Sequence, residues 1–137
     1  MLPSSKRGVT MTKEHAAQKL VDEAKSKLGR ALLATDIWVK GERISLAGHN
    51  PQPGATRFFD ELNDYIETSL KNSKFPKLSR YFLLELEEDN TVVIVNHGNV
   101  LQGMLINLRM ANMGSVVSLT VPHLIKTWKS AIGENLF

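Results

Sequence analysis

The chain contains no cysteine, which excludes disulfide bonds, a thiol nucleophile and cysteine-ligated zinc or iron–sulfur sites. It also lacks a long hydrophobic run: apolar stretches such as 92–95 stop at four residues, whereas a membrane-spanning helix needs about 20. No apolar stretch of the length of a secretory signal follows Lys6 and Arg7 near the N-terminus. We therefore expect a cytoplasmic protein that does not insert into a membrane.

What the chain does contain is typical of one globular domain. Its 137 residues match the length of a single core, and 42% hydrophobic with 23% charged residues is an ordinary composition. The net charge of +3 arises within residues 1–50, where basic and acidic side chains alternate as on a solvated helix. No zinc finger, RNP-like aromatic pair or basic helix is present, so we expect no nucleic-acid binding. We expect 1–11 to be a flexible N-terminal tail and 12–137 to be one domain.

Hydrophobic periodicity predicts the order of helices and strands. The expected elements are a helix capped by Thr12 and ended by Gly29, strands at 31–39 and 43–47, a helix at 55–70, strands at 80–88, 91–96 and 100–110, and a final helix. The stretch from Met113 to Val121 suits a helix and a strand equally. Because Pro122 is comfortable only in the first turn of a helix, we favour a helix over 122–132 with a kinked extension toward Met113.

This order predicts the fold class. We expect an α/β (α+β) sandwich in which a five-stranded antiparallel sheet is flanked by three helices, in the order α-β-β-α-β-β-β-α. The strands at 32–39, 91–95 and 101–108 carry apolar side chains at both parities, as a sheet covered on both faces requires.

The sequence shows no catalytic motif. Each of its four histidines stands alone, without a second ligand at helical spacing, so we expect no metal. No nucleophile elbow, P-loop or dinucleotide-binding glycine pattern occurs, so we expect no catalytic residue and no cofactor. An enzymatic hypothesis nevertheless stays open, in which His97 or His49 acts with the acidic cluster at 85–89 in a small hydrolase or transferase.

Two elements are candidates for an interface. The strand at 80–88 is apolar on both sides at its start and charged at its end, which is typical of an edge strand that pairs with its own symmetry mate. The helix at 55–70 has the strongest apolar stripe in the chain. The predicted interface residues are Phe58, Phe59, Leu62, Tyr65, Ile66, Tyr81, Leu83 and Glu85.

Four segments carry a recognisable pattern: the hairpin VKGERISLAG, the amphipathic middle helix, the strand pair YFLLELEEDNTVVIVNHGN and the step LINLRMANMG that leads into the last helix. Together they resemble the roadblock/dynein-light-chain superfamily. The similarity covers about 12–132. Pro122 and the proline-rich loop at 48–54 depart from the family pattern.

The resemblance implies a profilin-like sandwich that homodimerises through its third strand and middle helix. It also implies a function, because stand-alone bacterial members are similar to partners and regulators of Ras-like small GTPases. In that case GTP hydrolysis belongs to the partner. No arginine of this chain is evident as a catalytic arginine finger, and the sequence leaves this role open for Arg57 and Arg109. The leading hypothesis is therefore a non-enzymatic homodimeric adaptor that binds a small GTPase or a larger assembly. The alternative is a small-molecule-binding sensory domain of profilin-like fold.

Overall fold

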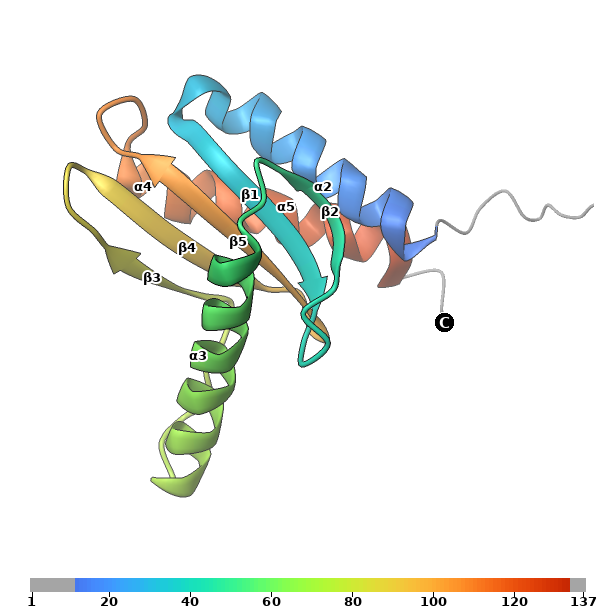
Figure 1. Ribbon diagram of the computed structural model, residues 1–137, viewed down its shortest axis with the longest axis vertical. Coiled ribbons are helices and arrows are strands. Elements are labelled where there is room, and N and C mark those ends of the chain that lie inside the picture. Colours follow the sequence, from blue (N-terminus) through green and yellow to red (C-terminus); the bar gives the residue numbers. More distant parts are fainter. Residues whose placement is uncertain (1–11, 134–137) are drawn as a thin grey trace, which may run out of the picture.

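The computed structural model describes residues 12–133, and a five-stranded antiparallel sheet forms the centre of this part of the chain (Figure 1). The elements are α2 (Lys13–Leu28), the 3-10 turn η1 (Gly29–Ala31), β1 (Leu32–Val39), β2 (Ser45–His49), α3 (Pro53–Asn72), β3 (Tyr81–Glu85), β4 (Asn90–Asn96), β5 (Val100–Asn107), α4 (Met113–Ser115), η2 (Val116–Thr120), α5 (Val121–Trp128) and η3 (Lys129–Gly133). The strand order is β2-β1-β5-β4-β3, so β2 and β3 are the edges. The predicted fold class is confirmed, while the predicted tail at 1–11 lies outside the described residues.

One face of the sheet, which we call the closed face, is covered by α2 and α5 (Figure 1). Helix α2 begins where the Thr12 hydroxyl oxygen accepts a hydrogen bond from the His15 N–H at 3.1 Å, and it ends at Gly29, whose φ is 56°. The two helices are joined by a 2.6 Å contact between His123 Nε2 and Glu23 Oε1. The largest fully buried side chains between the closed face and its helices are Leu20, Val21, Ile37, Val93, Val95, Met104, Ile106 and Leu124.

The opposite face, which we call the open face, carries a smaller apolar cluster and only α3. Trp38, Val92, Ile94 and Leu101 form its buried part. The Trp38 ring lies against Gly103 on the neighbouring strand, where an added Cβ would stand only 3.3 Å from the ring. Glycine at this position lets the Trp38 ring approach the strand closely, and any larger residue would push the ring away by a few tenths of an ångström.

Turns make several strands shorter than the sequence pattern suggested. The prediction of a strand over 80–88 was too long, because Glu88 and Asp89 take φ values of 61° and 62° and turn the chain after β3. The prediction of a strand over 43–47 was displaced, because Arg43, at φ 60°, belongs to the hairpin turn and β2 continues to His49. The strand predicted to reach 110 ends at Asn107.

The C-terminal segment is helical from Met113 onward, which settles the choice between helix and strand. It begins where the Asn112 side-chain oxygen accepts a hydrogen bond from the Ser115 N–H at 3.0 Å. In a regular α-helix the Pro122 ring would clash with the carbonyl four residues earlier. The wider π-helical turn η2 lies directly before Pro122, and it is closed by a hydrogen bond from the Val121 N–H to the Val116 carbonyl.

Candidate interaction surface on the open face

Helix α3 buries polar residues against the sheet, and Phe59 is the part of its apolar stripe that packs on the open-face cluster. Its buried residues are Thr56, Asp60 and Asn63, which recur at helical spacing. Among its aromatic side chains, Phe58 is 53% exposed and Tyr65 is 70% exposed. Since apolar stripes of helices normally face the core, this orientation leaves the outer part of the apolar stripe, with Phe58 and Tyr65, available to another surface.

The carboxylate of Asp60 attaches α3 to the β1–β2 hairpin. Its oxygens accept hydrogen bonds from Trp38 Nε1 at 3.0 Å, from the Gly41 N–H at 3.0 Å and from Arg43 Nε at 3.3 Å. Asp60 is almost fully buried, and these three donors compensate for the loss of its hydration. The Lys40 ammonium adds a 3.0 Å ion pair with Glu67 further along the helix.

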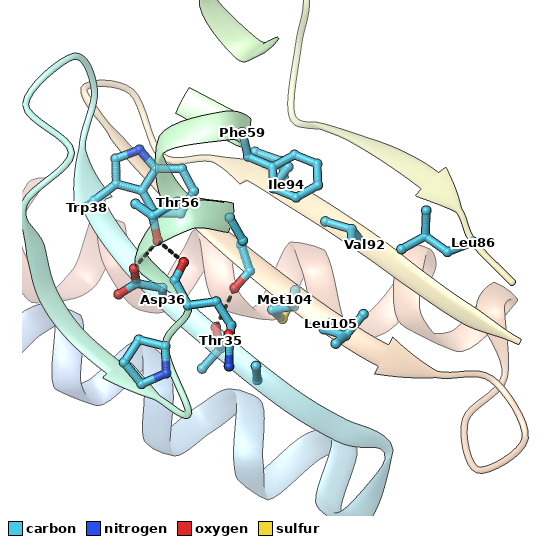
Figure 2. A pocket seen from close by; sticks show the side chains of 15 residues that line it. Thr35, Asp36, Trp38, Thr56, Phe59, Leu86, Val92, Ile94, Met104 and Leu105 are labelled. Atoms are coloured by element: carbon cyan, nitrogen blue, oxygen red, sulfur yellow. Dashed lines mark hydrogen bonds between the residues drawn. The ribbon is translucent and has the colours of Figure 1, made fainter. Parts of the chain in front are cut away.

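Asp36 on β1 makes the second attachment, at the beginning of α3. One of its carboxylate oxygens accepts a hydrogen bond from the Thr56 hydroxyl at 2.5 Å (Figure 2), and the other accepts one from the Ser45 hydroxyl, also at 2.5 Å. The helix is thus held above the sheet by two buried carboxylates and their donors. This attachment is directional, so it sets which side of α3 faces outward.

An apolar groove of about 260 Å³ lies between the first half of α3 and the open face. Figure 2 shows Phe59 of α3 above Ile94 and Val92 of β4, with Leu105 and Leu86 further along the same side. Asp36 and Thr56 supply polar groups at the end of the groove where α3 begins. The groove therefore continues the open face from α3 toward β3.

Strand β3 forms the edge of the sheet on this side and has no strand beyond it in residues 12–133. The alternate side chains Phe82 and Leu84 of β3 lie on the open face, because they are opposite Ile94 and Val92 of β4. Leu86, directly after the strand, lines the groove on the same face. Leu84 is 36% exposed and Leu86 is 44% exposed. The sequence prediction omitted these three residues, since either parity of an amphipathic edge strand can face outward.

The predicted interface residues divide between the two faces. Phe58 and Tyr65 are exposed on α3, and Phe59, Leu62 and Ile66 are half-buried there. On β3, Tyr81 and Leu83 are half-buried against the core of the closed face, and Glu85 is exposed. Within one protomer the structure therefore does not bring Tyr81 and Leu83 together with the stripe of α3.

The groups considered for catalysis lie apart from this surface. Burial lowers the pKa of His97 to about 4. The hydrogen bond between His97 Nε2 and Gln102 Oε1, at 3.2 Å, raises that pKa by less than burial lowers it. His49 contacts only the Asn50 side chain, at 3.4 Å, among the hydrogen bonds of the described chain. The acidic cluster at 85–89 is exposed, and Asp89 in it pairs with Arg109 at 2.9 Å.

Residues 12–133 hold no group of three or more metal-ligating side chains. No helix in that range is long and apolar enough to cross a membrane.

The comparisons with known proteins yield structural matches alone. No protein-family model matches the sequence, and no curated protein matches it. Among solved structures, the gliding protein MglB of Thermus thermophilus matches with a TM-score of 0.71 at 12% identity, over 92% of this chain and 96% of that one. MglB of Myxococcus xanthus matches with 0.75 at 10% identity, over 93% and 94%. A roadblock/LC7 domain from Streptomyces avermitilis matches with 0.56 at 12% identity, over 85% and 94%.

Proposed function

From the roadblock/LC7 fold of this chain, which confirms the resemblance seen in the sequence, we propose that the protein is a non-enzymatic homodimeric adaptor and that it regulates a Ras-like small GTPase. The dimer forms through α3 and the free edge of β3. One observation carries the proposal: α3 is attached to the sheet by its polar side, and Phe58 and Tyr65 of its apolar stripe are exposed.

The edge strand supports pairing with a second copy. An exposed edge with apolar side chains such as Leu84 and Leu86 is an aggregation hazard unless another strand covers it. Two copies of β3 related by a two-fold axis satisfy each other's free backbone groups and join the sheets into one. The charged residues after Glu85 limit how far this pairing extends along the chain.

The position of α3 supports the same dimer. Its buried residues all lie at or before Asn63, and its second half extends beyond its own sheet, next to the chain that leads into β3 (Figure 1). A second sheet joined at β3 places an apolar open face on that side. The exposed residues of α3, of which Tyr65 is the most exposed, then pack against the open face of the partner's sheet.

The small GTPase is the partner that the roadblock resemblance implies. The solved structures with this fold include two proteins named MglB, one of them described as a gliding protein. The adaptor acts by holding the switch loops of the GTPase in one arrangement, and the chemistry of hydrolysis stays with the partner.

The mass of the protein in solution tests the dimer. We expect the wild type to sediment as a dimer at tens of micromolar and Leu84→Lys to sediment as a monomer, because the new charges repel across the joined edges. Leu119→Lys is the matched control, since Leu119 is 66% exposed on the C-terminal helix. A monomeric wild type, or equal effects of both substitutions, would contradict the dimer.

A pull-down with GTP-loaded and GDP-loaded Ras-like GTPases encoded near this protein tests the partner. We expect the wild type and Leu119→Lys to retain one loaded form preferentially, and monomeric Leu84→Lys to lose it. If a dimeric wild type retains neither form, the GTPase part of the proposal is wrong and the dimer stands.

The apolar groove favours a second candidate, the small-molecule-binding domain. Its volume of about 260 Å³ lies just below the usual range for ligand pockets, which begins at about 300 Å³, so it suits a small ligand. Under this alternative an apolar ligand raises the melting temperature of the monomeric Leu84→Lys variant. Absence of a shift across a library of apolar metabolites argues against it.

A further inference from the structure

The chain carries opposite charges on the two sides of the edge strand β3. Residues 71–80, which lead from the end of α3 into the strand, contain no acidic side chain and four cationic ones: Lys71, Lys74, Lys77 and Arg80. Residues 85–89, at the other end of the strand, contain no cationic side chain and four acidic ones: Glu85, Glu87, Glu88 and Asp89. All of these side chains are exposed. The edge strand therefore has a basic beginning and an acidic end.

Most of these charges find no opposite charge within their own chain. Among the ion pairs of residues 12–133, only Asp89 comes from either segment, and its partner is Arg109 after β5. The four cations and the three glutamates form no salt bridge in that range. Since like charges gathered on a short segment repel one another, each segment favours a neighbour of the opposite sign.

The backbone of β3 shows which of its residues can bond to another strand. The Arg80 carbonyl accepts a hydrogen bond from the Asn96 N–H at 2.8 Å, and the Leu86 N–H donates to the Asn90 carbonyl at 2.7 Å. Both bonds point across to β4. Residues that bond to one neighbour alternate along a strand with residues whose N–H and C=O point to the other side. The outward backbone groups of β3 therefore belong to the odd positions, Tyr81, Leu83 and Glu85.

The symmetry of a homodimer restricts how two such edges meet. When two sheets continue into one with both open faces on the same side, opposite residues share a face, so odd positions lie opposite odd positions. A pairing centred on Leu83 places Tyr81 opposite the partner's Glu85, and every outward residue then meets an outward residue. A shift of the centre to Phe82 or Leu84 leaves Glu85 or Tyr81 opposite a residue outside the partner's strand.

We propose that β3 pairs antiparallel with β3 of a second copy, with Leu83 opposite the partner's Leu83, and that the opposite charges at the two ends of the strand select this orientation and register. An antiparallel pair brings the basic segment of each copy beside the acidic segment of the other, twice in each dimer, whereas a parallel pair brings like charges together. Exposed ion pairs add little affinity, so the charges act on orientation while backbone hydrogen bonds and apolar contacts hold the copies together. This register rests on the homodimer proposed above and specifies its interface.

Cysteine cross-linking of the full chain tests the register, because the chain has no thiol of its own. In an antiparallel pair, opposite Cα atoms of a hydrogen-bonded pair lie about 5.5 Å apart, within reach of a disulfide, and diagonal neighbours lie about 7–8 Å apart. We expect Leu83→Cys to form a covalent dimer under mild oxidation and the matched control Leu84→Cys to stay uncross-linked. A mixture of Tyr81→Cys and Glu85→Cys should cross-link, while each variant alone should not.

The outcomes separate the register from the dimer itself. If a dimeric wild type gives cross-linking of Leu84→Cys in place of Leu83→Cys, and no cross-linking in the mixture, the register is wrong and the homodimer stands. A wild type that sediments as a monomer would overturn both. The mixture keeps the test decisive if Leu83→Cys fails to fold, because Glu85 is exposed at the end of the strand.

Charge reversal tests the selection. The double variant Lys77→Glu, Arg80→Glu should dimerise about tenfold more weakly at low salt, because each change acts twice in a symmetric dimer. The matched control Lys25→Glu, Lys27→Glu, on exposed positions of α2, should dimerise as the wild type does. Adding Glu87→Lys and Glu88→Lys to the first variant should restore most of the affinity. Equal affinities of the first variant and the control, or no recovery in the combined variant, would overturn the role of charge.

Discussion

The two faces of the sheet are covered by helices in opposite ways. On the closed face, α2 and α5 bury apolar side chains such as Leu20 and Leu124 against the strands. On the open face, α3 is held by hydrogen bonds to Asp36 and Asp60, and its aromatic side chains Phe58 and Tyr65 remain exposed. The apolar sides of α2 and α5 therefore face the core, whereas α3 places polar residues against the sheet and leaves part of its apolar side exposed.

This difference follows from the partners that each helix finds. A polar side chain on the inner side of a helix is tolerated when its hydrogen bonds are complete, and Asp60 has three donors. The apolar side of α3 is then free to bury area in an assembly. A strong amphipathic pattern thus shows that a helix lies at an interface, without showing whether that interface is internal or between chains.

The largest loss of stability should follow truncation of a core side chain on the closed face. Leu124 is fully buried under α2 and the strands. We expect Leu124→Ala to lower the free energy of unfolding by about 2–5 kcal/mol, because the methyl groups are lost and a cavity remains. Urea denaturation measures it. A loss below about 1 kcal/mol would show that the closed face is not the main core.

Low pH should reduce the free energy of unfolding through protonation of His97, which packs against Trp128. Its pKa is about 4 in the folded chain, below the ordinary value of 6.5, so the unfolded chain takes up the proton first as the pH falls. The stability that comes from burying the neutral His97 ring is fully present above pH 6.5. It is lost as the pH falls through 4, and the total loss is about 3 kcal/mol. Lowering the pH from 7 to 4 should therefore reduce the free energy of unfolding more in the wild type than in His97→Gln. Urea denaturation at each pH measures the difference. Parallel pH profiles would contradict this.

The polar attachment of the open face can be removed at Asp60. We expect Asp60→Ala to cost about 2 kcal/mol, because the Trp38 N–H and the Gly41 N–H lose their acceptor. Asp64→Ala is the matched control, since Asp64 is exposed on the same helix. Thermal unfolding of the two variants gives the difference. Equal stabilities would mean that α3 is held by something other than its carboxylate.

The smallest effect on the isolated chain is expected on the outer side of α3. In the Leu84→Lys background, Tyr65→Ser should change the free energy of unfolding by less than about 0.5 kcal/mol, because Tyr65 is exposed. In the wild-type background the same substitution should weaken dimerisation. Concentration-dependent unfolding compares the two. A large loss in the Leu84→Lys background would place Tyr65 in the monomer core and remove the contrast between the faces.

Much of the fold could be predicted because its signals are local. The apolar stripe of α2 between Thr12 and Gly29, the order of elements and the helical nature of the segment after Pro122 all follow from spacing and from backbone chemistry. The strand ends were less accurate. The positive φ angles of Arg43, Glu88 and Asp89 occur at residues that carry no glycine signal.

The candidate surface could be predicted only in part. The stripe of α3 and the apolar strand β3 were found from periodicity, and Phe58 and Tyr65 are exposed as an interface requires. Periodicity did not show which alternate side chains of β3 face the open side, so the prediction did not include Leu84 and Leu86. Their direction depends on the pairing of β3 with β4 and on the helices that pack behind the sheet.

The amino-acid sequence alone determined the elements, their order and which of them are amphipathic, since these properties depend on neighbours within a few residues. The tertiary structure decided which side of each amphipathic element faces the solvent. It placed β3 at an edge, and it gave Asp60 of α3 its partners Trp38 and Gly41, about 20 positions earlier. Contacts between residues far apart in the chain set these directions, so α3 keeps polar residues inside and presents Phe58 and Tyr65, while α2 and α5 bury their apolar sides.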